Sequence, residues 1–213
     1  MIGTVRAPAL RRLRGIGAFV GLVAWPEVAK SQETWPAPQR LALGAFAGAI
    51  ALAPDHDLVD ASYEKYAFKA MSPEVGIRSS YFFQPRVGAE AELAGGATRT
   101  RDPASHWAAF GALRTHAILS LPVEGESFKP FVLAGAGVLA VATGVMGHDV
   151  DPAIHGGVGT FYRATRSWLL RAELRATASP GAADHGVPAV HGEVLFGGSY
   201  EASAPATTST PRP

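Results

Sequence analysis

Hydrophobic and polar residues alternate along the segment 168–177, which reads WLLRAELRAT. Its even-numbered positions hold Trp, Leu and Ala, whereas the odd-numbered positions hold Arg171, Glu173 and Arg175, with Leu169 as the one exception. A period of two is typical of a β-strand with one apolar and one polar face. In a helix the same residues would scatter charged and apolar groups around the axis. The pattern therefore predicts a strand, and in a soluble sheet its polar face would meet water.

Seven other segments have a length and spacing that suit strands. The eight predicted strands are residues 41–53, 71–83, 87–93, 107–121, 128–141, 154–163, 168–177 and 189–200. The first and the fifth carry small or apolar residues on both faces, so the pattern leaves their registers open. The first also fits a short helix, although Gly44 and Gly48 each disfavour a helix by about 1 kcal/mol.

The connections between these strands alternate between long and short. The long ones are residues 54–70, 95–105, 142–151 and 179–188, and the short ones are residues 84–86, 122–127 and 164–167. Outer-membrane barrels show this alternation because long loops face the cell exterior and tight turns face the periplasm. We therefore expect an all-β fold, an eight-stranded antiparallel up-and-down transmembrane β-barrel with long extracellular loops and short periplasmic turns.

Composition favours close-packed strands over a helical membrane protein, because the chain has many Gly and Ala residues, little charge and no long apolar run. Charged residues make up 17% of the 213-residue chain, below the roughly 25% that is usual for soluble domains, and 24 residues are Gly. The formal net charge of +1 gives no basis for a nucleic-acid partner. Cysteine is absent, which excludes disulfides and thiolate metal sites.

The N-terminal segment reads as an export signal. Arg6, Arg11, Arg12 and Arg14 form a basic region, and the apolar run 15–25 is shorter than the about 20 residues that span a bilayer. Small residues before Gln32 suit a cleavage site; the alternative is a cytosolic protein with a basic amphipathic start. We expect a signal peptide at 1–31, an outer-membrane barrel at 32–200 and a disordered periplasmic tail at 201–213, in a Gram-negative bacterium.

If the apolar faces point to lipid, the polar faces converge on a lumen. The predicted lumen salt-bridge network comprises Arg78, Glu90, Glu92, Arg114, His116, Arg171, Glu173, Arg175, His191 and Glu193. The interior of an eight-stranded barrel is just wide enough for side chains to fill it, and buried ions need partners. This set therefore predicts a plugged, salt-bridged interior; the alternative is the mixed-charge surface of a soluble sheet.

Aromatic residues gather near the strand ends, mostly beside the short turns. The predicted membrane-interface aromatics are Tyr81, Trp107, Phe128, Tyr162, Trp168 and Tyr200. Trp35, Phe82 and Phe83 also lie near the short turns, whereas Trp107 lies at the opposite end of the strands. Amphipathic rings favour the headgroup level, so this distribution is typical of an aromatic girdle.

Three runs resemble the second half of an OmpA-type outer-membrane barrel: PFVLAGAGVLAV from Pro130, HGGVGTFYRATRSWLLRAELR from His155 and HGEVLFGGSYE from His191. The resemblance implies that Arg171, Glu173 and Arg175 join interior salt bridges. It also implies that Tyr200, with Phe196, is similar to the terminal aromatic that the barrel-insertion machinery recognises. Because only a Thr/Pro-rich tail follows, the family's peptidoglycan-binding domain is not expected.

Two clusters suggest other chemistry. His148, Asp149, Asp151 and His155 carry metal-ligand groups, and Asp184, His185, His191 and Glu193 carry groups found in hydrolytic sites. The first set is explained more simply by a polar loop, in which His and Asp are common. The second set lacks a nucleophile elbow, so it is explained more simply by side chains that fill the barrel lumen. We therefore expect neither a metal, a cofactor nor an enzyme.

The functional hypothesis is a structural outer-membrane barrel that supports envelope integrity, with loops available for surface contacts and at most a narrow pore. Its expected partners are outer-membrane lipid and the insertion machinery, and it is expected to be a monomer that binds no nucleic acid. The alternatives are an outer-membrane enzyme that acts on lipid and a soluble periplasmic lipocalin-like carrier.

Overall fold

The computed structural model describes residues 39–60, 62–122, 127–181 and 187–202, and within them the chain forms eight β-strands. The strands are β1 (Leu41–Ala51), β2 (Ser72–Phe82), β3 (Val87–Arg99), β4 (Trp107–Ser120), β5 (Phe128–Thr143), β6 (Gly147–Arg163), β7 (Trp168–Ser179) and β8 (Ala189–Glu201). The expected signal peptide at 1–31, Trp35, Asp184, His185 and the tail from residue 203 lie outside the described residues.

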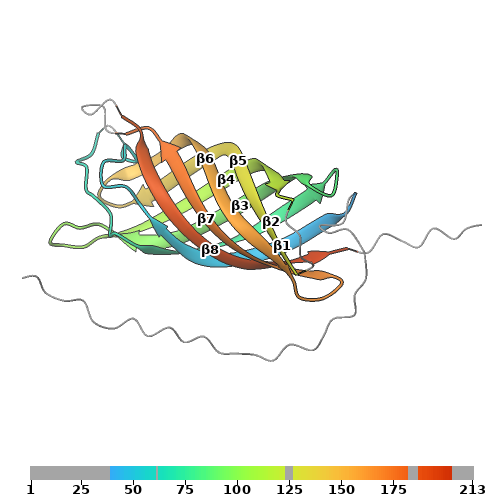
Figure 1. The fold of residues 1–213 in the computed structure, drawn as a ribbon. Helices are drawn as coiled ribbons and strands as arrows, with labels where there is room; N and C mark the ends of the chain where they lie inside the picture. The colour runs from blue at the N-terminus through green and yellow to red at the C-terminus, as the bar shows by residue number, and fades with distance from the viewer. Residues whose placement is uncertain (1–38, 61, 123–126, 182–186, 203–213) are drawn as a thin grey trace, which may run out of the picture. The chain divides into compact units, whose positions relative to one another are not determined.

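Every strand pairs antiparallel with its neighbour in sequence, and β1 pairs with β8 to close the barrel (Figure 1). Closure leaves no unpaired sheet edge. We refer to the end at which β1 begins and β8 ends as the turn end, and to the opposite end as the loop end. The expected fold, a closed eight-stranded up-and-down barrel, is confirmed.

The apolar faces of the strands point away from the barrel interior. Leu113 in β4 and Leu174 in β7 are 55% and 56% exposed, whereas Arg114 and Arg175, one residue further along each strand, are buried. The period of two therefore divides a strand between an outer apolar face and an inner polar face. In β1, whose register the sequence left open, Phe46 points inward.

Several strands extend beyond their predicted ends, and β3 and β6 do so by the most residues. β3 continues to Arg99 rather than ending at Leu93, and β6 begins at Gly147 rather than at Ile154. The connection after β5 is therefore only residues 144–146, and the predicted long loop at 142–151 is wrong. Polar and glycine positions in these segments look like loop residues, but the end of β3 pairs in register with β4, and the start of β6 pairs in register with β5.

Glycine in the strands makes room for inward-facing phenylalanine rings. A Cβ added to Gly159 in β6 would lie 2.4 Å from the ring of Phe131, and one added to Gly96 in β3 would lie 2.5 Å from the ring of Phe110. These contacts are too close for any side chain at either position. Gly96 thus belongs to β3 because Phe110 packs over it, and it does not mark the start of a loop.

The interior has an apolar layer near each end. The turn-end cluster consists of Phe82, Ile118, Phe131, Leu133, Phe161 and Leu169, all of which are buried. Phe82 therefore faces the interior, and its expected place beside the aromatic girdle is wrong. The loop-end cluster contains Phe46, Ile50, Leu52, Leu58, Phe68, Ala94, Ala108, Phe110, Ala112, Leu139, Val141, Met146, Ala153 and Leu195.

The connection between β1 and β2 supplies part of the loop-end cluster. Leu58 and Phe68 from this connection are buried in it together with Met146. The backbone N–H of Asp60 donates to the carbonyl oxygen of Met146 at 3.1 Å, which fixes the connection against the short β5–β6 turn. An isolated bridge between His56 and Gly181 ties it to the β7–β8 connection. The connection therefore covers the loop end of the interior.

Among the residues that the structure describes, none forms a helix long and apolar enough to cross a membrane.

Candidate functional site

The middle of the barrel interior holds a layer of charged side chains. The structure places all ten predicted lumen residues on inward-facing strand positions, where each is buried. It adds two that the sequence interpretation missed, Glu74 in β2 and His155 in β6. We define the ionic layer as Glu74, Arg78, Glu90, Glu92, Arg114, His116, Arg171, Glu173, Arg175 and Glu193.

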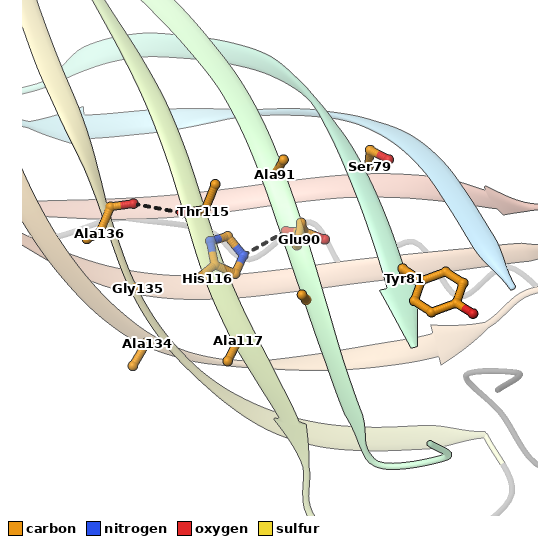
Figure 2. A pocket seen from close by; sticks show the side chains of 11 residues that line it. Ser79, Tyr81, Glu90, Ala91, Thr115, His116, Ala117, Ala134, Gly135 and Ala136 are labelled. Atoms are coloured by element: carbon orange, nitrogen blue, oxygen red, sulfur yellow. Dashed lines mark hydrogen bonds and ion pairs between the residues drawn. The ribbon is translucent and has the colours of Figure 1, made fainter. Parts of the chain in front are cut away.

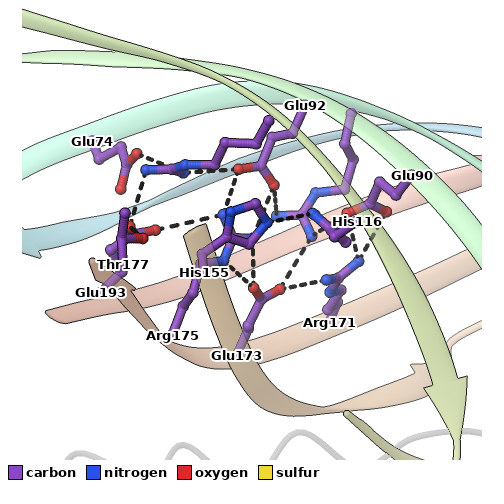
Figure 3. A network of polar contacts seen from close by, with 12 residues as sticks. Glu74, Glu90, Glu92, His116, His155, Arg171, Glu173, Arg175, Thr177 and Glu193 are labelled. Atoms are coloured by element: carbon purple, nitrogen blue, oxygen red, sulfur yellow. Dashed lines mark hydrogen bonds and ion pairs between the residues drawn. The ribbon is translucent and has the colours of Figure 1, made fainter. Parts of the chain in front are cut away.

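Arg114 and Arg175 organise the half of the ionic layer nearer the loop end; Figure 3 shows Arg175 with Glu74, Glu92 and Glu193 in this network. Arg114 donates to Glu92 and to Glu193 at 2.9 Å each, and to Glu74 at 3.3 Å. Arg175 donates to both carboxylate oxygens of Glu92, at 2.7 and 3.1 Å. Each guanidinium thus serves several carboxylates, which a planar group with five donors can do.

Arg171 and Arg78 organise the other half. Arg171 donates to both carboxylate oxygens of Glu90, at 3.0 and 2.9 Å, and also pairs with Glu173. Arg78 donates to Glu173 at 3.5 Å and lies 3.7 Å from Glu90. His116 lies 2.9 Å from Glu90, so three basic residues surround this one carboxylate.

The ionic layer is close to neutral. It holds five carboxylates, Glu74, Glu90, Glu92, Glu173 and Glu193, against four guanidinium groups, those of Arg78, Arg114, Arg171 and Arg175. His116 lies between Glu90, at 2.9 Å, and the ring of His155, at 3.2 Å. Buried ions are tolerated only when paired and hydrogen-bonded, and this arrangement meets that condition.

Arginine side chains connect the ionic layer to the apolar layers on either side. The guanidinium of Arg171 lies over the Phe131 ring, 4.5 Å from its centroid, and therefore contacts the turn-end cluster. The guanidinium of Arg78 lies 4.3 Å from the centroid of the Phe46 ring, in the loop-end cluster. Cation–π contacts of this kind are favourable where water is excluded. The three layers therefore form one continuous packed interior.

His191 lies inside the barrel, but the network does not extend to it. The Nδ1 atom of His191 accepts a hydrogen bond from the backbone N–H of Ala53 at 3.0 Å. In the neutral ring the proton is therefore on Nε2, and this nitrogen lies 3.0 Å from the hydroxyl oxygen of Ser179. The Ser179 hydroxyl in turn donates to the carbonyl of Pro180 at 3.5 Å. His191 therefore donates to Ser179 instead of accepting its proton, the reverse of what a general base does.

The other described residues of the two clusters considered for chemistry do not converge either. Glu193 is held by Arg114, at 2.9 Å. In β6, His148 is exposed, whereas Asp151 and His155 are buried on the inward face. No metal site therefore forms from the set at 148–155 within the described structure.

One group in the ionic layer has metal-ligand spacing. Glu90, Glu92 and His116 each offer an atom within 4.8 Å of the others. Both carboxylates already accept hydrogen bonds from arginine, Glu90 from Arg171 and Glu92 from Arg175. A divalent cation between them would meet these guanidinium groups at short range, so the geometry fits an ion-pair network better than a metal centre.

The predicted interface aromatics lie near the barrel ends. Tyr81, Trp107, Phe128, Trp168 and Tyr200 are exposed on the outer wall, and Tyr162 is partly exposed. Phe128 stacks with Tyr162 with centroids 4.9 Å apart, and Trp168 meets Tyr200 edge-on at 5.6 Å. These four rings belong to the turn end, and Trp107 belongs to the loop end.

A shallow depression of about 630 Å³ lies on the outer wall between β2 and β5. It is lined by small exposed residues such as Ala91, Thr115 and Ala136, and the Thr115 hydroxyl donates to the carbonyl of Ala136 at 3.4 Å (Figure 2). Glu90 and His116 border it only from behind, because their side chains are buried in the interior. The depression therefore presents mostly small side chains, with the ring of Tyr81 and the hydroxyl of Ser79 in its lining.

Neither a family model nor a curated protein sequence matches the chain. Among solved structures, it is similar to Neisserial surface protein A, with a TM-score of 0.55 and 14% identity over 76% of this chain and 96% of that one. It is also similar to Ail, the attachment invasion locus protein of Yersinia pestis, with a TM-score of 0.51 and 12% identity over 78% of this chain and 99% of that one. The chain has the fold of a small outer-membrane β-barrel.

The outer-membrane barrel fold explains the reversed placement of apolar and charged residues. In a soluble barrel, Leu113 and Leu174 would be packed in the centre, whereas in this fold they face the hydrocarbon of a bilayer. The expected likeness to small outer-membrane barrels is confirmed at the level of the fold. At 14% and 12% identity, the comparisons show the fold and leave the function to be argued from the residues.

Proposed function

We propose that the protein is a structural β-barrel of the outer membrane of a Gram-negative bacterium, closed to ions and solutes, with its loop end toward the cell exterior. It supports envelope integrity and offers its loops for surface contacts. The observation that carries this proposal is the filling of the interior by three successive layers, apolar, ionic and apolar.

The layers leave a permeating ion no favourable path. It would have to enter the turn-end cluster, whose apolar side chains offer a cation no ligand, and where the guanidinium of Arg171 lies over the rings of Phe131 and Phe161. It would then have to separate pairs such as Arg175 and Glu92, and finally cross the loop-end cluster. Each step costs several kcal/mol in an interior from which water is excluded.

The outer wall supports membrane placement. Apolar side chains cover its middle, and aromatic pairs lie toward the turn end, where Trp168 meets Tyr200. Aromatic rings at the ends of an apolar belt are typical of membrane interfaces. We propose the same role for Trp107 at the loop end, and recognition of Tyr200, in the last strand, by the insertion machinery.

The two alternative functions have less support. A lipocalin-like carrier needs an apolar cavity, but the centre of this barrel holds charged side chains in contact with one another. A lipid hydrolase needs an activated nucleophile, and the hydrogen bond between His191 and Ser179 runs in the wrong direction.

Fractionation and bilayer recordings test the proposal together. The protein is expected in the outer-membrane fraction, to need detergent for release, and to migrate differently on electrophoresis before and after boiling. Folded protein inserted into planar bilayers is expected to give no conductance steps beyond those of lipid alone. Release without detergent would contradict the membrane placement, and sustained open-channel steps would contradict the closed interior.

A further inference from the structure

A row of basic residues lies on the outer wall at the loop end, where the β1–β2 connection pairs with the end of β3. The N–H of Lys69 donates to the carbonyl of Arg99 at 2.8 Å, and the N–H of Arg101 donates to the carbonyl of Ala67 at 2.8 Å. In the same row, Arg99 is the register partner of Trp107 in β4. Lys69, Arg99 and Trp107 therefore lie side by side on three adjacent segments.

The alternation of side chains along the strands indicates that this row of basic residues faces outward. Phe68 and Thr100 form a bridge and are fully buried, so Lys69, Arg99 and Arg101, one residue to either side of them, face away from the interior. We define the rim patch as Lys69, Arg99, Arg101 and Trp107. It brings three positive charges and one indole ring together on one part of the wall.

Arg99 is held in place within the rim patch. Its guanidinium lies over the indole of Trp107, 4.1 Å from the ring centroid, and its Nη1 donates to the carbonyl of Ser105 at 3.4 Å. Stacking on an indole orients the guanidinium without consuming its remaining N–H donors. The side chain is thus preorganised to bind an anion.

The positive charges of the rim patch have no counterion in the described part of the chain. The neighbouring carboxylate of Asp102 accepts from the N–H of Ala104 and faces His106 at 3.6 Å. The carboxylate of Glu64 accepts from the hydroxyl of Tyr66 at 2.8 Å. The interactions that these two carboxylates make are thus with groups outside the rim patch, although one oxygen of Asp102 has no hydrogen-bond partner, whereas the carboxylates of the ionic layer all pair with arginine.

The rim patch borders the apolar belt of the outer wall. Trp107 is 63% exposed, and the outward side chains that follow toward the middle of the barrel, Met71, Val75 and Leu93, are all more than half exposed and uncharged. In a membrane, this border coincides with the level at which hydrocarbon gives way to headgroups.

We propose that the rim patch binds the phosphate group of a lipid headgroup in the outer leaflet. The inference goes beyond the proposed structural role and rests on the proposed membrane placement. Arginine and lysine both bind phosphate, and arginine does so through paired N–H donors. The adjoining apolar wall favours a phosphate that is attached to acyl chains over a free one, because the chains can lie against Met71 and Val75.

The test compares charge-matched variants in nanodiscs of digalactosyldiacylglycerol, whose headgroup carries no phosphate, to which bis-phosphorylated lipid A or its dephosphorylated form is added. R99Q/R101Q removes two charges from the rim patch, and R86Q/R166Q removes two exposed charges from the turn end as a control. Native mass spectrometry measures the lipid A that each folded barrel retains. Retention of the phosphorylated form is expected to fall about fivefold for each rim charge removed, and to be unchanged in R86Q/R166Q.

The outcomes separate this inference from the proposed function. The lipid-phosphate site would be overturned if the wild type and R99Q/R101Q retained the same amount of phosphorylated lipid A. It would also be overturned if the wild type retained both lipid forms equally, or if R86Q/R166Q lost as much lipid as R99Q/R101Q. Displacement of the lipid by excess inorganic phosphate would overturn the choice of a lipid headgroup. Failure of the wild type to enter nanodiscs would overturn the membrane placement itself.

Discussion

Arg175 and Glu92 join opposite walls of the barrel through two parallel hydrogen bonds, at 2.7 and 3.1 Å. Arg175 belongs to β7 and Glu92 to β3, and in the closed order of eight strands these two are four strands apart in either direction. A bidentate pair of this kind constrains both distance and orientation. It therefore ties together two walls that share no backbone hydrogen bond.

Breaking this pair from one side is expected to destabilise the barrel strongly. Arg175→Leu leaves Glu92 with fewer partners in a buried site, and the expected loss in free energy of unfolding is about 3–5 kcal/mol. Glu92→Leu should cost a similar amount, because it leaves Arg175 and Arg114 short of a carboxylate. Urea unfolding in lipid vesicles, followed by tryptophan fluorescence, measures both losses.

The double variant E92L/R175L distinguishes pairing from simple packing. Two leucines remove both charges together, so the double variant should lose clearly less than the sum of the two single losses. Thr115→Ala on the outer wall is the control and should change stability by less than about 0.5 kcal/mol. Additive losses would show that the two residues act independently.

The contact between Gly159 and Phe131 leads to a second prediction. A Cβ at residue 159 would crowd the Phe131 ring and lie 2.5 Å from the backbone oxygen of Ala172, so Gly159→Ala should displace the ring from the turn-end cluster and cost about 1–3 kcal/mol. Gly192→Ala in β8 is a matched control, because nothing lies within 4 Å of the added methyl. Phe131→Leu in the Gly159→Ala background should restore part of the lost free energy of unfolding. If Gly159→Ala and Gly192→Ala destabilised the barrel equally, the packing argument would be contradicted.

The alternation of residues predicted most of the strands and the placement of the ionic layer. In β7, apolar leucine residues alternate with the charged residues Arg171 and Glu173. Because only the inner side of the barrel wall carries charge, this alternation tells which residues of β7 face inward and which face outward. Glu74 shares the parity of Arg78 in β2, so the same rule could have found it. His155 lies among glycines in β6, where the alternation is too weak to assign a face.

The apolar ends of the interior could not be predicted in the same way. The rule that the inner face is polar fails for Phe46 and Phe131, because near its ends the barrel fills its interior with apolar rings instead of ions. The contact between the β1–β2 connection and Met146 joins residues far apart in sequence and follows no period. Such packing depends on closure of the barrel, which the local sequence does not encode.

A third prediction concerns His56 in the β1–β2 connection. Its ring is fully buried, stacks on Phe68 at 4.5 Å and accepts a hydrogen bond from the N–H of Leu58 at 3.2 Å. Burial, together with the nearby positive charge of Lys65, lowers the pKa of His56 from 6.5 to about 4. Between these two values, the opened connection binds a proton that the packed connection does not.

The packed connection should therefore lose stability as the pH falls. The contribution of neutral His56 is fully present above pH 6.5 and is lost progressively toward pH 4, by at most about 3 kcal/mol. Hydrogen exchange of residues 52–60, corrected for the intrinsic effect of pH, should show less protection at pH 5 than at pH 7. His56→Gln cannot titrate and should reduce this difference, although the ring of His191, which accepts from the N–H of Ala53, still contacts the connection. Substitution of the exposed His106 by Gln should preserve the difference. If His56→Gln kept the full pH dependence, another group would control the opening of the loop end.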